Sequence, residues 1–313
     1  MLTITIITVA YNSEKTIADT LRSVSKQTYP YIEHIVVDGG SKDNTLSIVR
    51  DFKHITKTIS EPDYGVYDAM NKGLRIATGD VIGFLNSDDI YADDMVLERI
   101  ANVFELKNID SLYSDLDFFE NHSDNVVRVW NAGLVKRRRF LYGWMPPHPT
   151  FFCKKNVYER FGTFDLAFKQ SADYELMLRL IYRHGISMHY LQGISIKMRT
   201  GGLSNASFKN RWRANQEDAF AWRKNGLQPY FFTAWLKPLA KLEQFKSIYR
   251  TLRIFKQQAG HIYSKTSTPM IAEQNQHVGM ELRVPVRRLR ATTHPQPLAR
   301  LQGFDWRDRV RRP

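Results

Sequence analysis

Short apolar runs alternate with amphipathic segments over the first part of the chain. Four runs are rich in β-branched and apolar residues, as buried strands are: residues 3–10, 32–37, 55–60 and 81–85. The segments between them space apolar residues as helices do: the segment with Ile17, Leu21 and Val24, then residues 43–52, 66–78 and 93–106. We expect Asn12 or Ser13 to cap the first helix. The alternation predicts an α/β fold with a mostly parallel sheet flanked by helices.

The pattern changes after residue 106. Four further segments follow: mixed strands at 110–130, a basic, proline-containing loop at 131–149, a helix at 172–184 and a strand at 188–196. Beyond Gly201-Gly202 the pattern becomes helical and basic, and after Ser264 it loses its periodicity. We therefore predict an α/β domain at residues 1–206, a basic amphipathic helical extension at 207–263, and an Arg/Pro-rich tail at 264–313 that is expected to be disordered.

The whole chain has a formal net charge of +13, and its positive charge is concentrated in the last third. Residues 1–206 hold 24 Lys and Arg against 25 Asp and Glu, whereas residues 207–264 hold 11 against 3 and residues 265–313 hold 10 against 4. The first two thirds therefore need no polyanionic partner. Cys153 is the only cysteine, which excludes an intrachain disulfide and a multi-cysteine zinc site and fits a reducing cytosol.

Polar side chains follow two predicted strands at their carboxyl ends. The second strand runs into Asp38-Gly39-Gly40, and the fourth runs into Asn86-Ser87-Asp88-Asp89. Open α/β sheets bind ligands in the crevice beyond the carboxyl ends of their strands. No G-x-G-x-x-G follows the first strand, which argues against a dinucleotide-dependent dehydrogenase. The segment after that strand also lacks the glycine-rich phosphate loop of a sugar nucleotidyltransferase, the other enzyme class considered.

Four stretches, in their order and spacing, resemble the inverting GT-A glycosyltransferases of family 2, particularly bacterial exopolysaccharide, colanic-acid and O-antigen assembly members. They are Thr8 to Asn12, Val37 to Thr45, Glu61 to Gly73 and Asn86 to Asp89. The match continues more loosely to about Gly202. The resemblance implies a GT-A (Rossmann-like) fold and inverting, metal-dependent transfer of a sugar from a nucleotide-sugar donor. A UDP-sugar is the expected donor, and a hydroxyl of a lipid-linked or growing glycan in surface polysaccharide biosynthesis is the expected acceptor.

The resemblance also nominates residues that bind the donor. Thr8, Tyr11 and Asp38 match the positions that hold the nucleotide, and a carboxylate at a strand end can accept the imide N–H of uracil. The alternative for Asp38 is that it caps the turn before Gly39-Gly40. The remaining donor-binding candidates are Asp63, Asp68, Asn71, Lys72, Asp88 and Arg199. Asp63 and Asp68 could instead cap the helix near Val66, and Arg199 could close over the diphosphate beside Gly201-Gly202.

Asp88 and Asp89 are the predicted ligands of a divalent cation, Mn²⁺ or Mg²⁺. Hard cations prefer oxygen ligands, and a cation held by carboxylates can stabilise a departing diphosphate. The family's acidic triplet often has Asp where this chain has Asn86, so the first acidic position departs from the pattern. The alternative is a solvated pair of loop carboxylates.

Inversion requires a base opposite the leaving group, and Asp173 matches the family's catalytic position in the stretch Gln170 to Leu176. Glu175 is the reserve candidate. Asp173 could instead serve only the electrostatics of a helix N-terminus. His148 corresponds to a His often seen before the strand leading to the base, and it is the candidate for acceptor binding, with a structural, hydrogen-bonded His as the alternative.

Aromatic and basic residues mix in the last third, in residues 229–237 and in the bases that follow: Lys241, Lys246, Arg250, Arg253 and Lys256. Such segments suit a membrane interface. We therefore predict contact with an anionic membrane surface and a cytoplasmic, peripheral location on the inner face of the cell membrane. An amphipathic helix that covers the core is the alternative. A nucleic-acid-binding protein also fits the basic region, but no nucleic acid partner is expected because strand-end carboxylates would repel one.

Overall fold

The computed structural model describes residues 1–120, 125–134, 136–200, 208–230 and 233, with only the backbone described for residues 208–212. All of these belong to one compact unit, residues 1–264. The predicted tail at 264–313, and the predicted extension at 231–232 and 234–263, lie outside the described residues.

A parallel half-sheet opens the fold. Its strands are β1 (Ile4–Ala10), β2 (Ile32–Asp38), β3 (Lys57–Ser60) and β4 (Val81–Phe84). They pair in the order β3-β2-β1-β4, every pair parallel. Helices cover both faces, so β1 and β4 are buried along their whole length, which explains why neither strand carries a charged residue.

The sheet continues with a mixed half. Its strands are β5 (Ile90–Tyr91), β6 (Ser111–Phe119), β7 (Val126–Trp130), β8 (Phe152–Lys154) and β9 (Met188–Arg199). The order runs on as β8-β6-β9-β5, with β7 on β6. β6 and β9 are parallel, whereas β8 is antiparallel to both β4 and β6. The predicted α/β fold class is confirmed, with parallel pairing concentrated in the first four strands.

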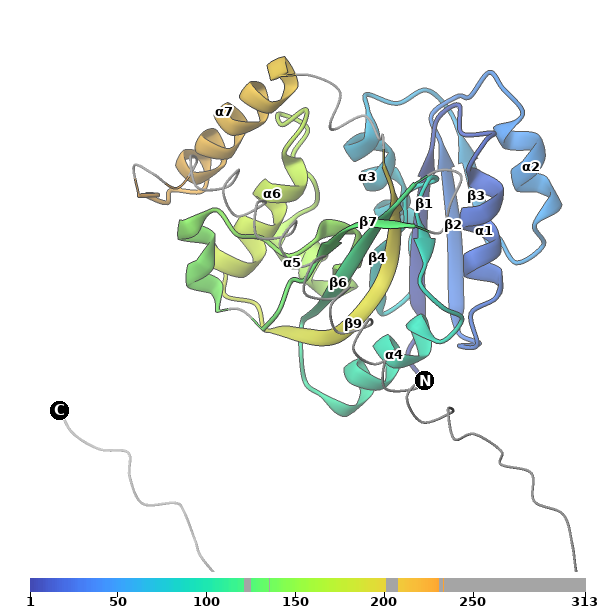
Figure 1. Ribbon diagram of the computed structural model, residues 1–313, viewed down its shortest axis with the longest axis horizontal. Coiled ribbons are helices and arrows are strands. Elements are labelled where there is room, and N and C mark those ends of the chain that lie inside the picture. The colour runs from blue at the N-terminus through green and yellow to red at the C-terminus, as the bar shows by residue number, and fades with distance from the viewer. Residues whose placement is uncertain (121–124, 135, 201–207, 231–232, 234–313) are drawn as a thin grey trace, which may run out of the picture. The chain divides into compact units, whose positions relative to one another are not determined.

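Helices flank the sheet as Figure 1 shows, with α1 and α2 beside β1 to β3 and α5 to α7 beyond β6. The α-helices are α1 (Ile17–Ser25), α2 (Thr45–Asp51), α3 (Val66–Ile76), α4 (Val96–Leu106), α5 (Lys155–Phe161), α6 (Ala172–Met177) and α7 (Phe208–Lys224). The 3-10 helices are η1 (Arg137–Tyr142) and η2 (His148–Thr150), and α6 continues as the π-helix η3 (Leu178–Arg183). The helix predicted at 172–184 therefore has two parts.

The predicted cap of the first helix is wrong. Thr16 is the N-cap of α1, and the carbonyl of Ser13 accepts the N–H groups of Thr16 and Ile17. Asn12 has a positive φ of 49°, and its Oδ1 accepts the N–H of Lys42 instead. The side chains of Asn12 and Ser13 bind neighbouring loops, which the local sequence does not reveal.

Helix α7 packs against α6. The Nε1 of Trp222 donates to the hydroxyl of Tyr174 over 2.9 Å, and the Nδ2 of Asn225 donates to Oε1 of Glu175 over 3.0 Å. Trp222 is buried, as are Tyr174 and Glu175. The described part of the predicted C-terminal extension is therefore built into the core of the unit.

Candidate active site

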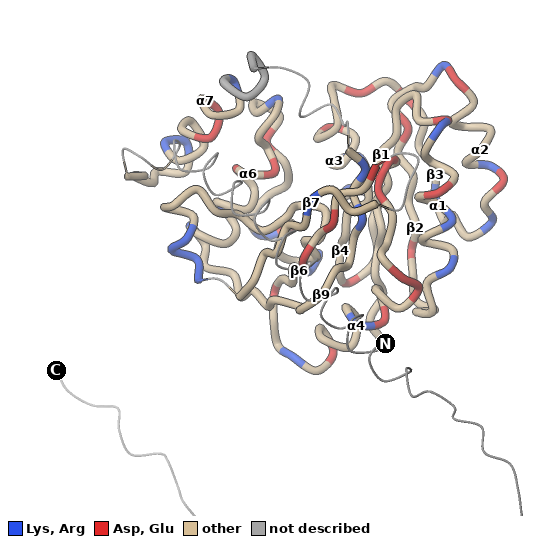
Figure 2. The backbone as a smooth tube through the Cα atoms, viewed as in Figure 1, with Lys and Arg blue, Asp and Glu red and all other residues tan. Residues whose placement is uncertain are grey.

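The carboxyl ends of the four parallel strands meet at one edge of the sheet. Ala10 lies beside Asp38, and Asp38 lies beside Ser60. The loops after β1 and β4 touch, because the hydroxyls of Ser13 and Ser87 lie 2.8 Å apart. Figure 2 shows acidic residues gathered at this edge, around β1 and α3. The strand ends and the loops that follow them therefore lie together at one edge of the sheet, as the sequence predicts.

Asp38 is fully buried and its carboxylate is already occupied. Oδ2 accepts the N–H groups of Gly40 and Ser41 and the hydroxyl of Ser60, and Oδ1 accepts the hydroxyl of Ser41. This is the turn-capping role, the alternative that the sequence left open. Asp38 thus fixes the turn that follows β2.

Thr8 is also separated from the crevice. Its side chain is fully buried, and its hydroxyl lies 3.0 Å from Nε2 of His34. The Nδ1 of His34 in turn lies 3.0 Å from Nε2 of His54. Burial lowers the pKa of His34 to about 3, so the ring is neutral in the folded protein. The hydroxyl of Thr8 belongs to this buried pair rather than to the group of side chains at the strand ends.

Tyr11, Gly39 and Asp63 form a surface at the strand ends. Tyr11 is 63% exposed. A Cβ on Gly39 would lie only 2.4 Å from Oδ2 of Asp63 and 3.4 Å from the ring of Tyr11. The carboxylate of Asp63 therefore occupies the space where a side chain at position 39 would stand. Its other oxygen accepts the N–H of Gly65 over 2.8 Å, which fixes its direction.

Three other donor-binding candidates hold the segment before and within α3. Asp68 Oδ2 accepts the N–H of Tyr64, which is the capping alternative. The Nζ of Lys72 donates to the carbonyl of Pro62 over 2.7 Å and pairs with Glu61 over 2.9 Å. Asn71 exchanges two hydrogen bonds with the backbone of Phe164. All three side chains are buried; Asp68 and Lys72 hold the loop that carries Asp63, whereas Asn71 holds the segment of Phe164.

Asp88 and Asp89 follow β4 at the crevice, and their environment disfavours the charged form. Burial raises the pKa of Asp88 and raises that of Asp89 well above its usual range, where the Asp88 charge adds to the effect. Asp89 Oδ2 accepts from Asn86, whereas Oδ1 is buried with no hydrogen-bond partner among the described residues. A buried, unpaired carboxylate oxygen is costly unless something positive binds it.

Arg199, at the end of β9, is the nearest compensating charge. It lowers the pKa of both Asp88 and Asp89, although less than burial raises them. Its guanidinium lies 2.6 Å from Oδ2 of Asp19 and 5.1 Å from the centre of the Phe119 ring. Arg199 therefore lies beside the acidic pair, as a diphosphate-binding residue must. Gly201-Gly202, the other part of the predicted lid, lie outside the described residues.

The two carboxylates fit a divalent cation as part of a ligand set. Oxygen donors, the unpaired Oδ1 of Asp89 and the raised pKa of both groups all favour a bound positive charge. Within the described ranges, no cluster of three or more His, Cys, Asp or Glu side chains could hold a metal ion. The remaining ligands would therefore have to come from a bound diphosphate and water.

Asp173 lies in the first turn of α6, beside residues from three other elements. Its Oδ1 accepts the hydroxyl of Tyr67 over 3.0 Å. The ring of His148 stacks on Phe84, the last residue of β4, with 5.6 Å between centres, and Phe164 packs edge-on against both. Burial lowers the pKa of His148, and the Asp173 charge acts in the opposite direction. We call Tyr67, Phe84, His148 and Phe164 the aromatic floor; it connects the end of β4 to Asp173.

Glu175, the reserve base, is held elsewhere. It is buried, and both of its oxygens bind Arg179, at 2.9 and 3.0 Å. Oε1 also accepts from Asn225. A carboxylate in a buried ion pair is poorly placed to take a proton from a substrate, so the geometry favours Asp173 for that task.

Sequence reasoning did not single out Tyr67, Phe164 or Glu217. Tyr67 lies within the motif from Glu61 to Gly73, so its position was a signal that could have been used. Phe164 and Glu217 lie in segments without a motif, and only the folded chain brings them to the site.

A family model and curated relatives match more than half of the chain. The model of the family described as "Glycosyl transferase family 2" matches residues 5–176. An uncharacterised glycosyltransferase of Mycobacterium tuberculosis is 33% identical over 181 residues, which are 56% of this chain and 68% of the relative. The UDP-Glc:alpha-D-GlcNAc-diphosphoundecaprenol beta-1,3-glucosyltransferase WfgD of Escherichia coli is 29% identical over 219 residues, covering 69% of this chain and 84% of WfgD.

Solved structures share the fold at low identity. TarS of S. aureus is 20% identical with a TM-score of 0.56, and the match covers 72% of this chain but only 41% of the TarS chain. Its fragment 1–349 in complex with UDP-GlcNAc gives a TM-score of 0.57. The mannosyltransferase PcManGT from Pyrobaculum calidifontis, in complex with GDP-Man and Mn²⁺, is 19% identical with a TM-score of 0.53, over 77% of this chain and 73% of that one. These likenesses confirm the GT-A fold.

Proposed function

The chain belongs to glycosyl transferase family 2, and from that premise we propose that it is an inverting, metal-dependent transferase. It moves a sugar from a nucleoside diphosphate donor, a UDP-sugar, to a hydroxyl of a lipid-linked or growing glycan in surface polysaccharide biosynthesis. One observation supports the proposal: the rings of the aromatic floor link Phe84, at the end of the strand that Asp88 and Asp89 follow, to Oδ1 of Asp173 through Phe164 and Tyr67.

The relatives support the donor and acceptor classes. WfgD is named for UDP-glucose and for an acceptor on diphosphoundecaprenol. TarS has been solved with UDP-GlcNAc. A lipid-linked acceptor would bring the enzyme to the cytoplasmic face of the membrane, as a peripheral protein that binds anionic lipid. Among the described helices, none is long and apolar enough to cross a bilayer.

The chain's own residues divide the reaction between two sides of the crevice. Asp173 accepts the proton of the acceptor hydroxyl as that oxygen attacks the anomeric carbon from the side opposite the diphosphate. The hydroxyl of Tyr67 donates to Oδ1 of Asp173 and so directs the other oxygen, Oδ2, to the acceptor. His148, stacked on Phe84, lines the acceptor side.

Asp88 and Asp89 would hold Mn²⁺ or Mg²⁺, which supplies positive charge to the departing diphosphate. Arg199 lies beside the pair and can bind the same phosphate oxygens through its guanidinium. Tyr11 and Asp63 face the nucleobase: the ring offers a stacking surface, and Oδ2 of Asp63 can accept an imide N–H. Asp38 supports this surface from below through its turn.

The test is nucleoside diphosphate release from a panel of UDP- and GDP-sugars, with Mn²⁺ or Mg²⁺ and diphosphoundecaprenol-linked acceptors. We expect Asp173→Asn to lower kcat by about 10²- to 10⁴-fold, because it removes the base. Asp51→Asn, an exposed aspartate on α2, is the matched control and should be unaffected. Full activity of Asp173→Asn would rule out Asp173 as the base. Full activity of the wild type in the presence of chelator would rule out the cation.

A further inference from the structure

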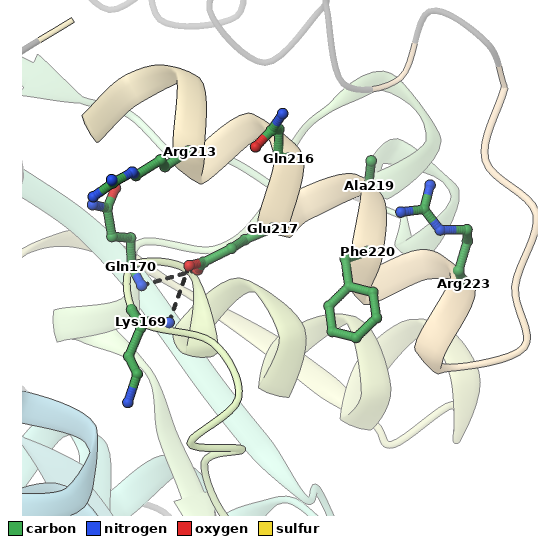
Figure 3. Close-up of a pocket in the computed structure, with 8 residues that line it drawn as sticks. All are labelled: Lys169, Gln170, Arg213, Gln216, Glu217, Ala219, Phe220 and Arg223. Carbon is green, nitrogen blue, oxygen red and sulfur yellow. Dashed lines mark hydrogen bonds between the residues drawn. The ribbon is translucent and has the colours of Figure 1, made fainter. Parts of the chain in front are cut away.

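The loop before α6 is held by a residue outside the matched family segment. Glu217, on α7, accepts the backbone N–H groups of three successive residues: Lys169 over 3.1 Å, Gln170 over 2.9 Å and Ser171 over 2.9 Å. Figure 3 shows the Glu217 side chain reaching from α7 to this loop, with its bonds to Lys169 and Gln170 drawn. A carboxylate is well suited to this place, because Ser171 is the N-cap of α6 and the N–H groups of Lys169 and Gln170 precede it in the loop, where no helix carbonyl accepts them.

The same loop is held from its other side by the site itself. The hydroxyl of Tyr67 lies 3.1 Å from the carbonyl of Gln170 and 3.0 Å from Oδ1 of Asp173. Asp173 follows Ser171 by two residues. The segment that carries the proposed base is therefore clamped between Tyr67 on α3 and Glu217 on α7.

Glu217 is itself fixed in place by its helix. Ser171 Oγ donates to the carbonyl of Ala214, one turn before Glu217, and the buried Trp222 bonds Tyr174. Because α7 is anchored on both sides of Glu217, the carboxylate can set the position of the loop rather than follow it.

We propose that Glu217 is a positioning residue for the transfer reaction: it caps α6 from α7 and so fixes the direction of Asp173. This inference rests on the proposed function, because Glu217 contacts neither substrate and acts only through Asp173, the proposed base. Misplacement of a catalytic group by about 1 Å can cost about 100-fold in rate.

The experiment measures kcat, donor KM and melting temperature for Glu217→Gln. The glutamine amide presents an N–H₂ group where one carboxylate oxygen accepted, so at least one of the three bonds is lost. We expect kcat to fall about 10- to 100-fold with donor KM within about twofold. Gln216→Ala, an exposed neighbour on the same helix, should match the wild type.

A double substitution separates positioning from general destabilisation. If Glu217 acts through Asp173, Glu217→Gln should change the residual rate of Asp173→Asn by less than about twofold, because the group it positions is already lost. An equal fall in both backgrounds would overturn the proposal, and so would an unchanged kcat for Glu217→Gln alone. Full activity of Asp173→Asn would instead refute the proposed base, so the two failures can be told apart.

Discussion

The donor side and the base side of the crevice are built in different ways. On the donor side, the side chains are fixed by near neighbours in the sequence: Asp38 by Gly40 and Ser41, and Asp89 by Asn86. On the base side, contacts come from far along the chain. Tyr67 and Asp173 are 106 residues apart, and Glu217 and Gln170 are 47 apart. Near neighbours thus supply most of the bonds to Asp38 and Asp89, with Ser60 as a more distant partner of Asp38, whereas the base side depends on distant contacts.

The two sides also differ in how completely their charges are satisfied. The base side offers Asp173 a hydroxyl and caps its helix with Glu217. The donor side leaves Oδ1 of Asp89 without a partner among the described residues, next to a second carboxylate. The donor side therefore carries negative charge that a bound cation would offset beyond what Arg199 supplies, whereas the one hydrogen-bond partner of the Asp173 carboxylate within the described part of the chain is a neutral hydroxyl.

Among the substitutions on the donor side, loss of the Asp88 charge has the largest expected effect. Asp88→Asn should lower kcat by about 10²- to 10³-fold, because the charge that develops on the diphosphate loses its support. The affinity for Mn²⁺, measured by calorimetry without donor, should fall too. In the wild type this affinity should weaken as the pH falls, because protons compete for carboxylates whose pKa is raised. Wild-type Mn²⁺ affinity in the variant would contradict the assignment.

Asp89→Asn should have opposite effects on activity and on stability. The folded-state pKa of Asp89 lies above its unfolded value, so its contribution to stability is present at acid pH and is lost as the pH rises through the raised pKa. Without a divalent cation at neutral pH, the asparagine variant should be more stable by about 1 to 3 kcal/mol, while its activity falls. Urea unfolding with and without Mn²⁺ checks this, and the gain should shrink when Mn²⁺ is added to both proteins.

The contrast also explains how much the sequence could predict. Four strand-end motifs identified the fold, the crevice and the acidic pair because each motif is a local structure with its own turn chemistry. Residue type alone did not say which way a side chain faces: Thr8 lies in the core against His34, and Asp38 binds its own turn. Glu217 could not be predicted, because its role depends on α7 packing against α6, a contact that no local pattern encodes.

A smaller effect sharpens the account of the donor side. In Gly39→Ala the new methyl group would meet Asp63 Oδ2, so the carboxylate must move. If Asp63 accepts a hydrogen bond from the base, donor KM should rise about tenfold or more. In the Asp63→Ala background the methyl group has room, so Gly39→Ala should raise donor KM little further. Additive effects of the two substitutions on KM would show that Gly39 acts independently of Asp63.

The smallest effect lies beneath the donor side, in the pair of His34 and His54. The pKa of His34 falls to about 3 on folding because burial disfavours its charged form. Between about pH 6.5 and pH 3 the unfolded chain therefore binds more protons than the folded chain. The neutral, buried His34 is compatible with full stability above pH 6.5, and the folded protein loses stability as the pH falls through this range. At pH 5 the free energy of unfolding is lower by about 2 kcal/mol on account of His34. His34→Gln keeps a hydrogen-bonding group for Thr8 but cannot titrate, so its stability relative to the wild type should improve by that amount between pH 8 and pH 5. Urea midpoints at the two pH values measure the change, and a constant difference would mean that His34 is charged, or solvated, in the folded protein.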